Sequence, residues 1–209
     1  MSAQPLAYFN HAGASLMSAS TVDAMVSHLH LETRLGGYGA AAHQHKALAA
    51  VYTQAAQLLG CDADEIALTD SHSRGWREVM NCLHFAPGDR ILVGRSEWGG
   101  NYAALTHIAQ RDGAVVEIIP CTPTGEVCLT QMATMLDHHV RLISLTWLPA
   151  NGGLIQPAAH VGALAHAAKI PFFLDAAQAV GQMPVDVRSL RCDVLTTPGR
   201  KWLRGPRGT

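Results

Sequence analysis

The feature that most constrains the fold is an alternation, along most of the chain, of short apolar runs with longer stretches of helical period. The short runs have the length of strands, and they read EIALT at 65–69, RILVG at 90–94, AVVEII at 114–119, RLISLTW at 141–147, PFFLD at 171–175 and DVLTT at 193–197. Helical spacing of apolar residues covers about 20–34, 43–59, 73–84, 100–112, 129–138 and 157–168. This alternation predicts an α/β fold with a mostly parallel sheet and helices on both faces.

Composition limits the class of protein. A chain of 209 residues with 48% hydrophobic residues can bury a core, and its formal net charge of −1 gives no general affinity for polyanions. Its five cysteines include no C-x-x-C pair, so neither a disulfide framework nor a zinc ribbon is predicted. The first residues lack a secretory pattern, and no apolar run approaches the roughly 18 residues of a membrane span. We therefore expect a cytoplasmic protein.

Polar side chains stand at the ends of the predicted strands, where open parallel sheets bind ligands. Asp175 ends the apolar run PFFLD, and Gln178 follows it by one helical turn. A carboxylate at the end of a buried strand needs a cationic or hydrogen-bonding partner. The alternative is a helix N-cap, a position that aspartate also favours.

The same edge of the sheet carries an amine, because Lys201 follows the strand at 193–197. A lysine that is partly desolvated and close to other cations has a lowered pKa and can act as a nucleophile. The alternative is a solvated surface lysine, which is the usual state of this side chain.

Further strand ends supply an anion seat, an aromatic face and an amide. After 65–69 the sequence DSHSRGW opens a helix, whose free N–H groups near His72 and Ser73 can hold a phosphate, although capping by Ser71 or Ser73 explains the same pattern. Trp98 follows 90–94, where it offers a flat face or packs into the core, and Asn151 follows 141–147. Together the residues at the strand ends predict a binding site for a flat, phosphorylated, nitrogen-containing aldehyde.

Motifs along essentially the whole chain resemble those of the class V aminotransferase family of pyridoxal-phosphate enzymes, which includes cysteine desulfurases and isopenicillin N epimerase-like proteins. The motifs are YFNHAGASL near the start, GGYGAAA at 36–42, TDSHSRGW at 69–76, SEWGGNY at 96–102, NGGLIQP at 151–157, LDAAQAVGQMPVDV at 174–187 and GRKWLRGPRGT at 199–209. The resemblance implies the large domain of a pyridoxal-phosphate-dependent transferase of fold type I, with pyridoxal 5'-phosphate as the cofactor.

Carried over position by position, the resemblance implies a role for each strand-end residue. Lys201 would form the Schiff base with the cofactor and shuttle the Cα proton, and Asp175 would keep the pyridine nitrogen protonated. Gln178 would hydrogen-bond the phenolic oxygen, Asn151 would lie near the same edge or the substrate, and Trp98 would stack on the ring.

The phosphate shell departs from the family pattern. His72 and Ser73 fall where relatives place small and hydroxyl residues around the phosphate. The position three before the lysine, commonly Ser or Thr in the family, is Pro198 here. The resemblance therefore implies that Thr197 or Thr196 replaces the lost hydroxyl and that Arg200 supplies charge.

Three other kinds of site fit the sequence less well. The histidine pairs at 28–30 and 43–45 are two residues apart, and such side chains point to different sides of a helix, so no metal site is predicted. No G-x-G-x-x-G follows the first strand, which argues against a nicotinamide dehydrogenase. The basic cluster near the end needs only one phosphate to explain it, so no nucleic-acid partner is predicted.

The family's members continue for well over a hundred residues beyond the lysine motif. We therefore expect residues 1–16 to form an N-terminal arm and 17–209 a partial cofactor-binding large domain, with the C-terminal small domain absent. The resemblance implies a homodimer that acts on a small amino-acid substrate by transamination, lyase or desulfurase chemistry, or epimerisation. The alternative is a truncated, non-catalytic remnant of such an enzyme.

Overall fold

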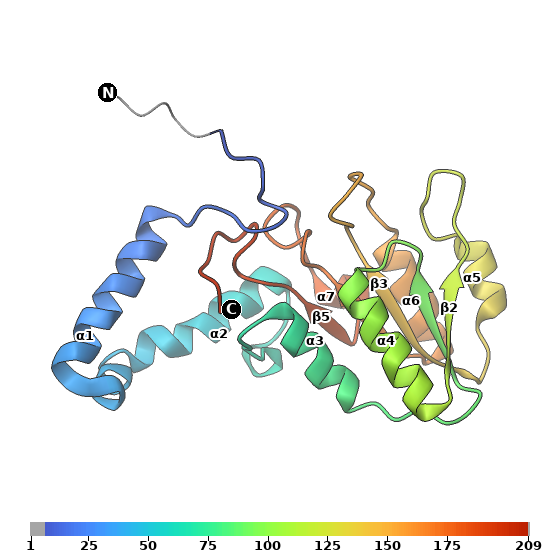
Figure 1. Cartoon of the computed structure of the whole chain (residues 1–209), viewed down its shortest axis with the longest axis horizontal. Coiled ribbons are helices and arrows are strands. Elements are labelled where there is room, and N and C mark those ends of the chain that lie inside the picture. Colours follow the sequence, from blue (N-terminus) through green and yellow to red (C-terminus); the bar gives the residue numbers. More distant parts are fainter. Residues whose placement is uncertain (1–6, 209) are drawn as a thin grey trace.

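The computed structural model describes residues 7–208, so residues 1–6 of the predicted arm and Thr209 lie outside the described part (Figure 1). The helices are α1 (Ala19–His43), α2 (His45–Leu59), α3 (His72–Asn81), α4 (Gly99–Asp112), α5 (Leu129–Met135), α6 (Ala158–Ala168) and α7 (Val187–Leu190), with a short 3-10 turn at Ala63–Glu65. The strands are β1 (Arg90–Gly94), β2 (Val115–Ile119), β3 (Val140–Thr146), β4 (Phe172–Asp175) and β5 (Val194–Thr196).

The strands form one parallel sheet in the order β2-β1-β3-β4-β5. Register brings the last residues of neighbouring strands level, so that Thr146 pairs with Asp175 and Asp175 pairs with Thr196. The predicted parallel sheet is confirmed, and its carboxyl edge gathers the polar strand ends in one place.

Helices cover both faces of this sheet, as the alternation predicted (Figure 1). On one face α3 and α4 pack on Ile91, Val93 and Phe173, and on the other α5, α6 and α7 pack on Leu92 and Phe172. Successive residues of a strand point to opposite faces, which explains why these strands are apolar throughout rather than alternating.

The predicted strand at 65–69 is wrong. Glu65 ends the 3-10 turn, where it forms a capping box with Asp62, and residues 66–69 have no regular structure. Leu68 is 53% exposed. Within the described residues no strand pairs with 66–69. An apolar run cannot form a strand without a neighbouring strand whose backbone groups pair with its own N–H and C=O groups.

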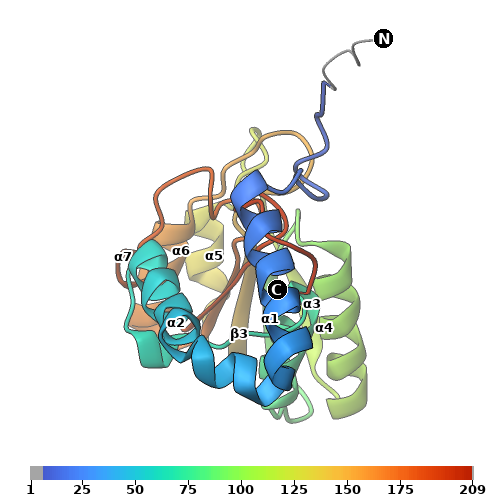
Figure 2. The ribbon, with the colours of Figure 1, turned by 90° about the vertical axis from the view of Figure 1, so that its left-hand side faces the viewer.

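The N-terminal helices lie to one side of the sheet (Figure 1), and Figure 2, viewed from that side, shows them in front of it. The predicted helix at 20–34 continues to His43, because Gly36 adopts a φ of 71° that kinks α1 instead of ending it. Ser18 caps the start of α1 by accepting a hydrogen bond from the Thr21 N–H. Among residues 7–208 no helix is long and apolar enough to cross a bilayer.

Gly162 marks the tightest contact between α6 and α7, so we expect Gly162→Ala to destabilise the protein. A Cβ atom at this position would lie 1.9 Å from the carbonyl oxygen of Leu190. Overpacking of this kind costs about 1–3 kcal/mol of unfolding free energy, which urea denaturation measures. The matched control is Gly37→Ala in α1, where the nearest atom is 4.0 Å away. Equal stability of the Gly162 variant and the wild type would contradict the close packing.

Candidate active site

A cavity of about 370 Å³ lies at the carboxyl edge of the sheet. Its walls come from the loops after β1, β3, β4 and β5, from the start of α3, and from Ala12 and Gly13 of the segment before α1. Every predicted site residue except Thr197 lines it: His72, Ser73, Trp98, Asn151, Asp175, Gln178, Arg200 and Lys201. The sheet therefore brings together residues that are up to 129 positions apart in the sequence, from His72 to Lys201 (201 − 72 = 129).

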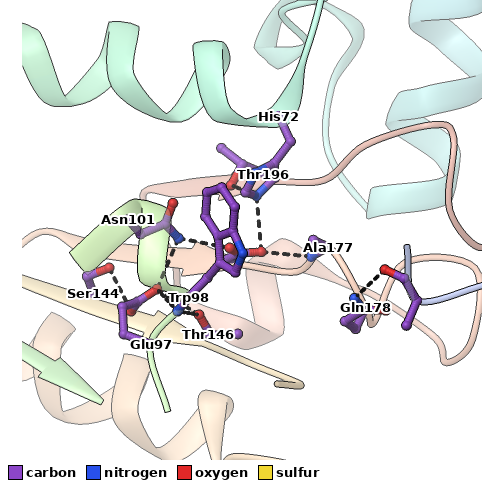
Figure 3. Close-up of polar contacts among 11 residues, drawn as sticks. His72, Glu97, Trp98, Asn101, Ser144, Thr146, Ala177, Gln178 and Thr196 are labelled. Atoms are coloured by element: carbon purple, nitrogen blue, oxygen red, sulfur yellow. Dashed lines mark hydrogen bonds and ion pairs between the residues drawn. The ribbon is translucent and has the colours of Figure 1, made fainter. Parts of the chain in front are cut away.

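Asp175 is the most buried ionisable residue of this cavity, with 2% of its surface exposed. His72 Nε2 lies 3.0 Å from Oδ1, the Ala177 N–H donates to Oδ1 at 2.9 Å, and the Asn101 amide donates to Oδ2 at 2.8 Å. Figure 3 labels His72, Asn101 and Ala177, whose dashed contacts meet between them. A carboxylate has about four acceptor positions, so these contacts leave one on Oδ2 for a further donor.

The environment keeps Asp175 ionised. Burial alone would raise its pKa, but the hydrogen bond and the charge of His72, together with the donors at Ala177 and Asn101, hold the pKa below its usual range. The partner that the sequence required for this carboxylate is thus His72, together with Asn101.

His72 is the first residue of α3, and its side chain faces the carboxylate. Its Nε2 also lies 3.0 Å from the hydroxyl oxygen of Thr196 at the end of β5. Ser71 caps the helix by accepting from the Arg74 N–H, which leaves Ser73 as the hydroxyl of α3 that lines the cavity. The start of α3 therefore offers two different surfaces, an imidazole toward Asp175 and a hydroxyl beside backbone N–H groups.

A second carboxylate of the cavity, the partly buried Glu97, was missed in the sequence. Its Oε1 accepts from Thr146 at 2.7 Å and from Asn101 at 3.0 Å, and its Oε2 accepts from Ser144 at 3.1 Å. Burial raises the pKa of Glu97, and the charge of Asp175 raises it further, although the three donors oppose this. Asn101 thereby joins the two carboxylates (Figure 3). Glu97 lies three residues after the end of β1, so the same strand-end argument could have found it.

Lys201 sits in the turn after β5 and is only partly exposed. Burial lowers the pKa of its amine; the charge of Asp175 acts in the opposite direction, and neighbouring Arg200 lowers the pKa again. The net lowering increases the fraction of uncharged amine at neutral pH. The reading of Lys201 as a fully solvated surface lysine is therefore excluded.

Trp98 forms part of the cavity wall, and it is 46% exposed, which excludes the alternative of a core aromatic. Its ring stands nearly perpendicular to that of His72, with 6.1 Å between the centroids (Figure 3). The indole lies across Gly100, where an added Cβ would be 2.1 Å from the ring. Asn151 is exposed at the mouth of the cavity, in the loop after β3.

Gln178 and Thr197 differ in how their polar atoms are used. The amide of Gln178 donates to the carbonyl oxygen of Ala12 and accepts from the indole N–H of Trp202. The Thr197 hydroxyl is buried and has no hydrogen-bond partner among the described residues. Thr197 does not line the cavity, so its contact with a phosphate stays a prediction.

The sequence was next compared with models of known protein families. The family model for Aminotransferase class-V matches residues 7–209. The chain belongs to this family. The resemblance stated from the motifs is thereby confirmed.

Relatives within the family include cysteine desulfurases. Those of Yersinia pseudotuberculosis serotype IB and of Yersinia pestis are 31% identical over 217 residues, an alignment that covers 98% of this chain and 52% of theirs. The chain thus spans about half the length of the curated relatives it matches.

Solved structures of the family superpose well on the chain. The complex of the cystine C-S lyase C-DES with cysteine persulfide is 26% identical, with a TM-score of 0.88 over 96% of this chain and 55% of that one. A lysine-to-alanine mutant of C-DES, in which glycine is linked covalently to the pyridoxal-phosphate cofactor, gives 26% identity and a TM-score of 0.87. The cysteine desulfurase CsdA of Escherichia coli gives 25% identity and a TM-score of 0.79. The predicted fold, a pyridoxal-phosphate-dependent transferase-like sheet of type I, is confirmed.

Proposed function

We propose that this chain carries the cofactor site of a pyridoxal-phosphate enzyme that acts on an amino acid. The observation that carries the proposal is the pairing, in one cavity, of a partly buried lysine of lowered pKa with a buried carboxylate that stays ionised. An uncharged amine can attack an aldehyde, and an ionised carboxylate can keep a pyridine nitrogen protonated.

The remaining residues fit the shape and charge of this cofactor. Ser73 with the N–H groups at the start of α3 and the guanidinium of Arg200 would hold the phosphate. Trp98 would cover the ring, and a cavity of about 370 Å³ falls in the range of small-molecule sites. His72 binds the carboxylate that would meet the ring nitrogen, so we assign it to that end of the cofactor rather than to the phosphate.

When bound, pyridoxal phosphate supplies an electron sink for breaking a bond at the amino acid's α carbon. The protein's part is to place and hold protons. Lys201 Nζ would bind the aldehyde and hold the proton that leaves the α carbon. Asp175 Oδ2, with its remaining acceptor position, would hold the proton of the ring nitrogen. Asn101 and His72 would keep that carboxylate oriented.

The family relatives act on cysteine or cystine by their names, which supports a small amino acid as the substrate. We further propose a cytoplasmic homodimer, with transamination, lyase or desulfurase, or epimerase chemistry as the outcome. A cofactor-binding protein without turnover is the second candidate.

Titration of the purified protein with pyridoxal phosphate tests the proposal. We expect a saturable visible absorption band, because the uncharged amine of Lys201 would hold the cofactor's aldehyde covalently. Assay of the products after addition of alanine or cysteine separates the two candidates, since an enzyme forms product faster than free pyridoxal phosphate does and a non-catalytic protein does not. No saturable band would refute both.

A further inference from the structure

The amide of Gln178 is held at both of its ends. Oε1 accepts from Trp202 Nε1 at 2.7 Å, and Nε2 donates to the carbonyl oxygen of Ala12 at 2.9 Å. The side chain is 5% exposed, so water does not compete strongly for either contact.

These two partners permit only one orientation of the amide. An indole N–H can only donate, and a backbone carbonyl can only accept. Turning the amide by 180° would set Nε2 against the indole N–H and Oε1 against the carbonyl oxygen, which loses both hydrogen bonds. The orientation thus follows from chemistry, without any reference to a ligand.

The orientation decides what the cavity presents. Gln178 and Ala12 both line the cavity, whereas Trp202 does not. Nε2 has two hydrogens, and Ala12 uses one of them. The wall therefore offers an N–H donor at this point, and the acceptor oxygen Oε1 faces away.

Trp202 is itself fixed from several sides. Gly181 has a φ of 92°, and a Cβ there would lie 2.9 Å from the Cβ of Trp202, so the glycine makes room for the turn that carries the indole. The ring of His11 lies 5.6 Å from that of Trp202, centroid to centroid. On either side, the Ser15 N–H donates to the carbonyl oxygen of Arg200, and Arg204 Nε donates to that of Leu16.

We propose that Trp202 is a positioning residue, whose indole N–H locks Gln178 so that the cavity selects a ligand with a hydrogen-bond acceptor at this point. An ionised oxygen on an aromatic ring is such an acceptor, and a donor in its place would meet Nε2–H unfavourably. The identity of the ligand rests on the proposed function, but the locked orientation does not.

The lock is tested first without any ligand. Nitrogen-15 spectra resolve the indole N–H groups of the tryptophans, and Trp202→Phe identifies the signal of Trp202. We expect slow deuterium exchange at this N–H, and an acceleration of at least about fivefold in Gln178→Ala, since a lost hydrogen bond is worth about 1 kcal/mol. The Trp76 N–H is buried without a partner among the described residues, so its exchange serves as the internal reference. Unchanged exchange at Trp202 in Gln178→Ala would overturn the proposal.

Pyridoxal phosphate is the probe for the second test. We expect Trp202→Phe to raise its Kd about fivefold, the loss expected for one orienting hydrogen bond. The pH midpoint of the bound cofactor's visible spectrum should move upward, because a donor stabilises the ionised oxygen. Trp76→Phe makes the same chemical change at an indole without a partner, so it should alter neither quantity.

A double-mutant cycle shows whether Trp202 acts through Gln178. In the Gln178→Ala background, Trp202→Phe should have almost no further effect on Kd or on the pH midpoint. Full additivity would mean that Trp202 only packs the turn, which contradicts the proposal. If the wild type fails to bind pyridoxal phosphate, the proposed function fails, and the exchange experiment still decides the lock.

Discussion

Lys201→Ala should abolish the visible absorption that pyridoxal phosphate produces with the protein. The amine of Lys201 is the lysine nitrogen that lines the cavity, and its lowered pKa leaves more of it uncharged at neutral pH. Borohydride fixes the cofactor to the lysine that holds it, and peptide mapping then locates the label. In the wild type we expect the label on Lys201, and in the variant no stoichiometric label.

The controls for this experiment lie elsewhere on the surface. Lys46 in α2 and Lys169 at the end of α6 are exposed and lie outside the cavity lining. Lys46→Ala and Lys169→Ala should retain the full absorption band. A wild-type label on either of these residues, or an undiminished band in Lys201→Ala, would show that the cavity does not hold the cofactor as proposed.

Asp175→Asn should weaken the binding of the cofactor far more than it lowers the stability of the fold. A neutral amide cannot hold the proton of a pyridine nitrogen, and hydrogen bonds to charged groups are worth about 1.5–3 kcal/mol, so the Kd should rise by about 10- to 150-fold. In a preparation that turns over amino acids, the rate should fall by about 100- to 1,000-fold, the loss seen when one preorganised group is removed. Asp23→Asn on the exposed side of α1 is the control. A Kd within twofold of the wild type would remove Asp175 from the site.

The same carboxylate links stability to acid pH. Its folded pKa lies below the usual value of 3.8, so ionised Asp175 stabilises the fold at pH values above 3.8, and this contribution is lost as the pH falls toward the folded pKa. The stability of Asp175→Asn should therefore depend less on pH in the acid range. Urea unfolding at a series of pH values measures the difference.

The sequence predicted those parts of the molecule that depend on local pattern. Apolar runs locate the strands, and parallel pairing then places their last residues at one edge, which is why Asp175, Trp98 and Lys201 were found together. The prediction of a strand at 65–69 was wrong because it rested on the apolar residues alone. A strand also needs a neighbouring strand that accepts and donates its backbone hydrogen bonds. The predicted helix at 20–34 is too short, because α1 continues to His43 through a kink at Gly36.

The interactions that the sequence did not reveal depend on distant partners. The hydrogen bond from Trp202 to Gln178 spans 24 residues, and that from Gln178 to Ala12 spans 166. Neither has a local signal, because each residue taken alone is an ordinary choice for a loop. The link from Asn101 to Asp175 spans 74 residues, and it became visible only when β1 and β4 were placed one strand apart.

The cavity wall at Ala12 depends on residues much later in the sequence, so during synthesis on the ribosome it forms after the sheet. The hydrogen bond between Arg204 and Leu16 joins residues 188 positions apart, and it runs beside the contacts that seat Ala12 against Gln178. At about 5–20 residues per second, the segment around Ala12 emerges on the order of ten seconds or more before its partners are synthesised. During that interval the sheet can assemble from β1 to β4 while the wall at Ala12 stays open. A nascent chain that has emerged from the exit tunnel only as far as Asp175 would thus hold a sheet without a pocket, and ligand-dependent protection from proteolysis should arise only after the turn at Lys201 has left the tunnel.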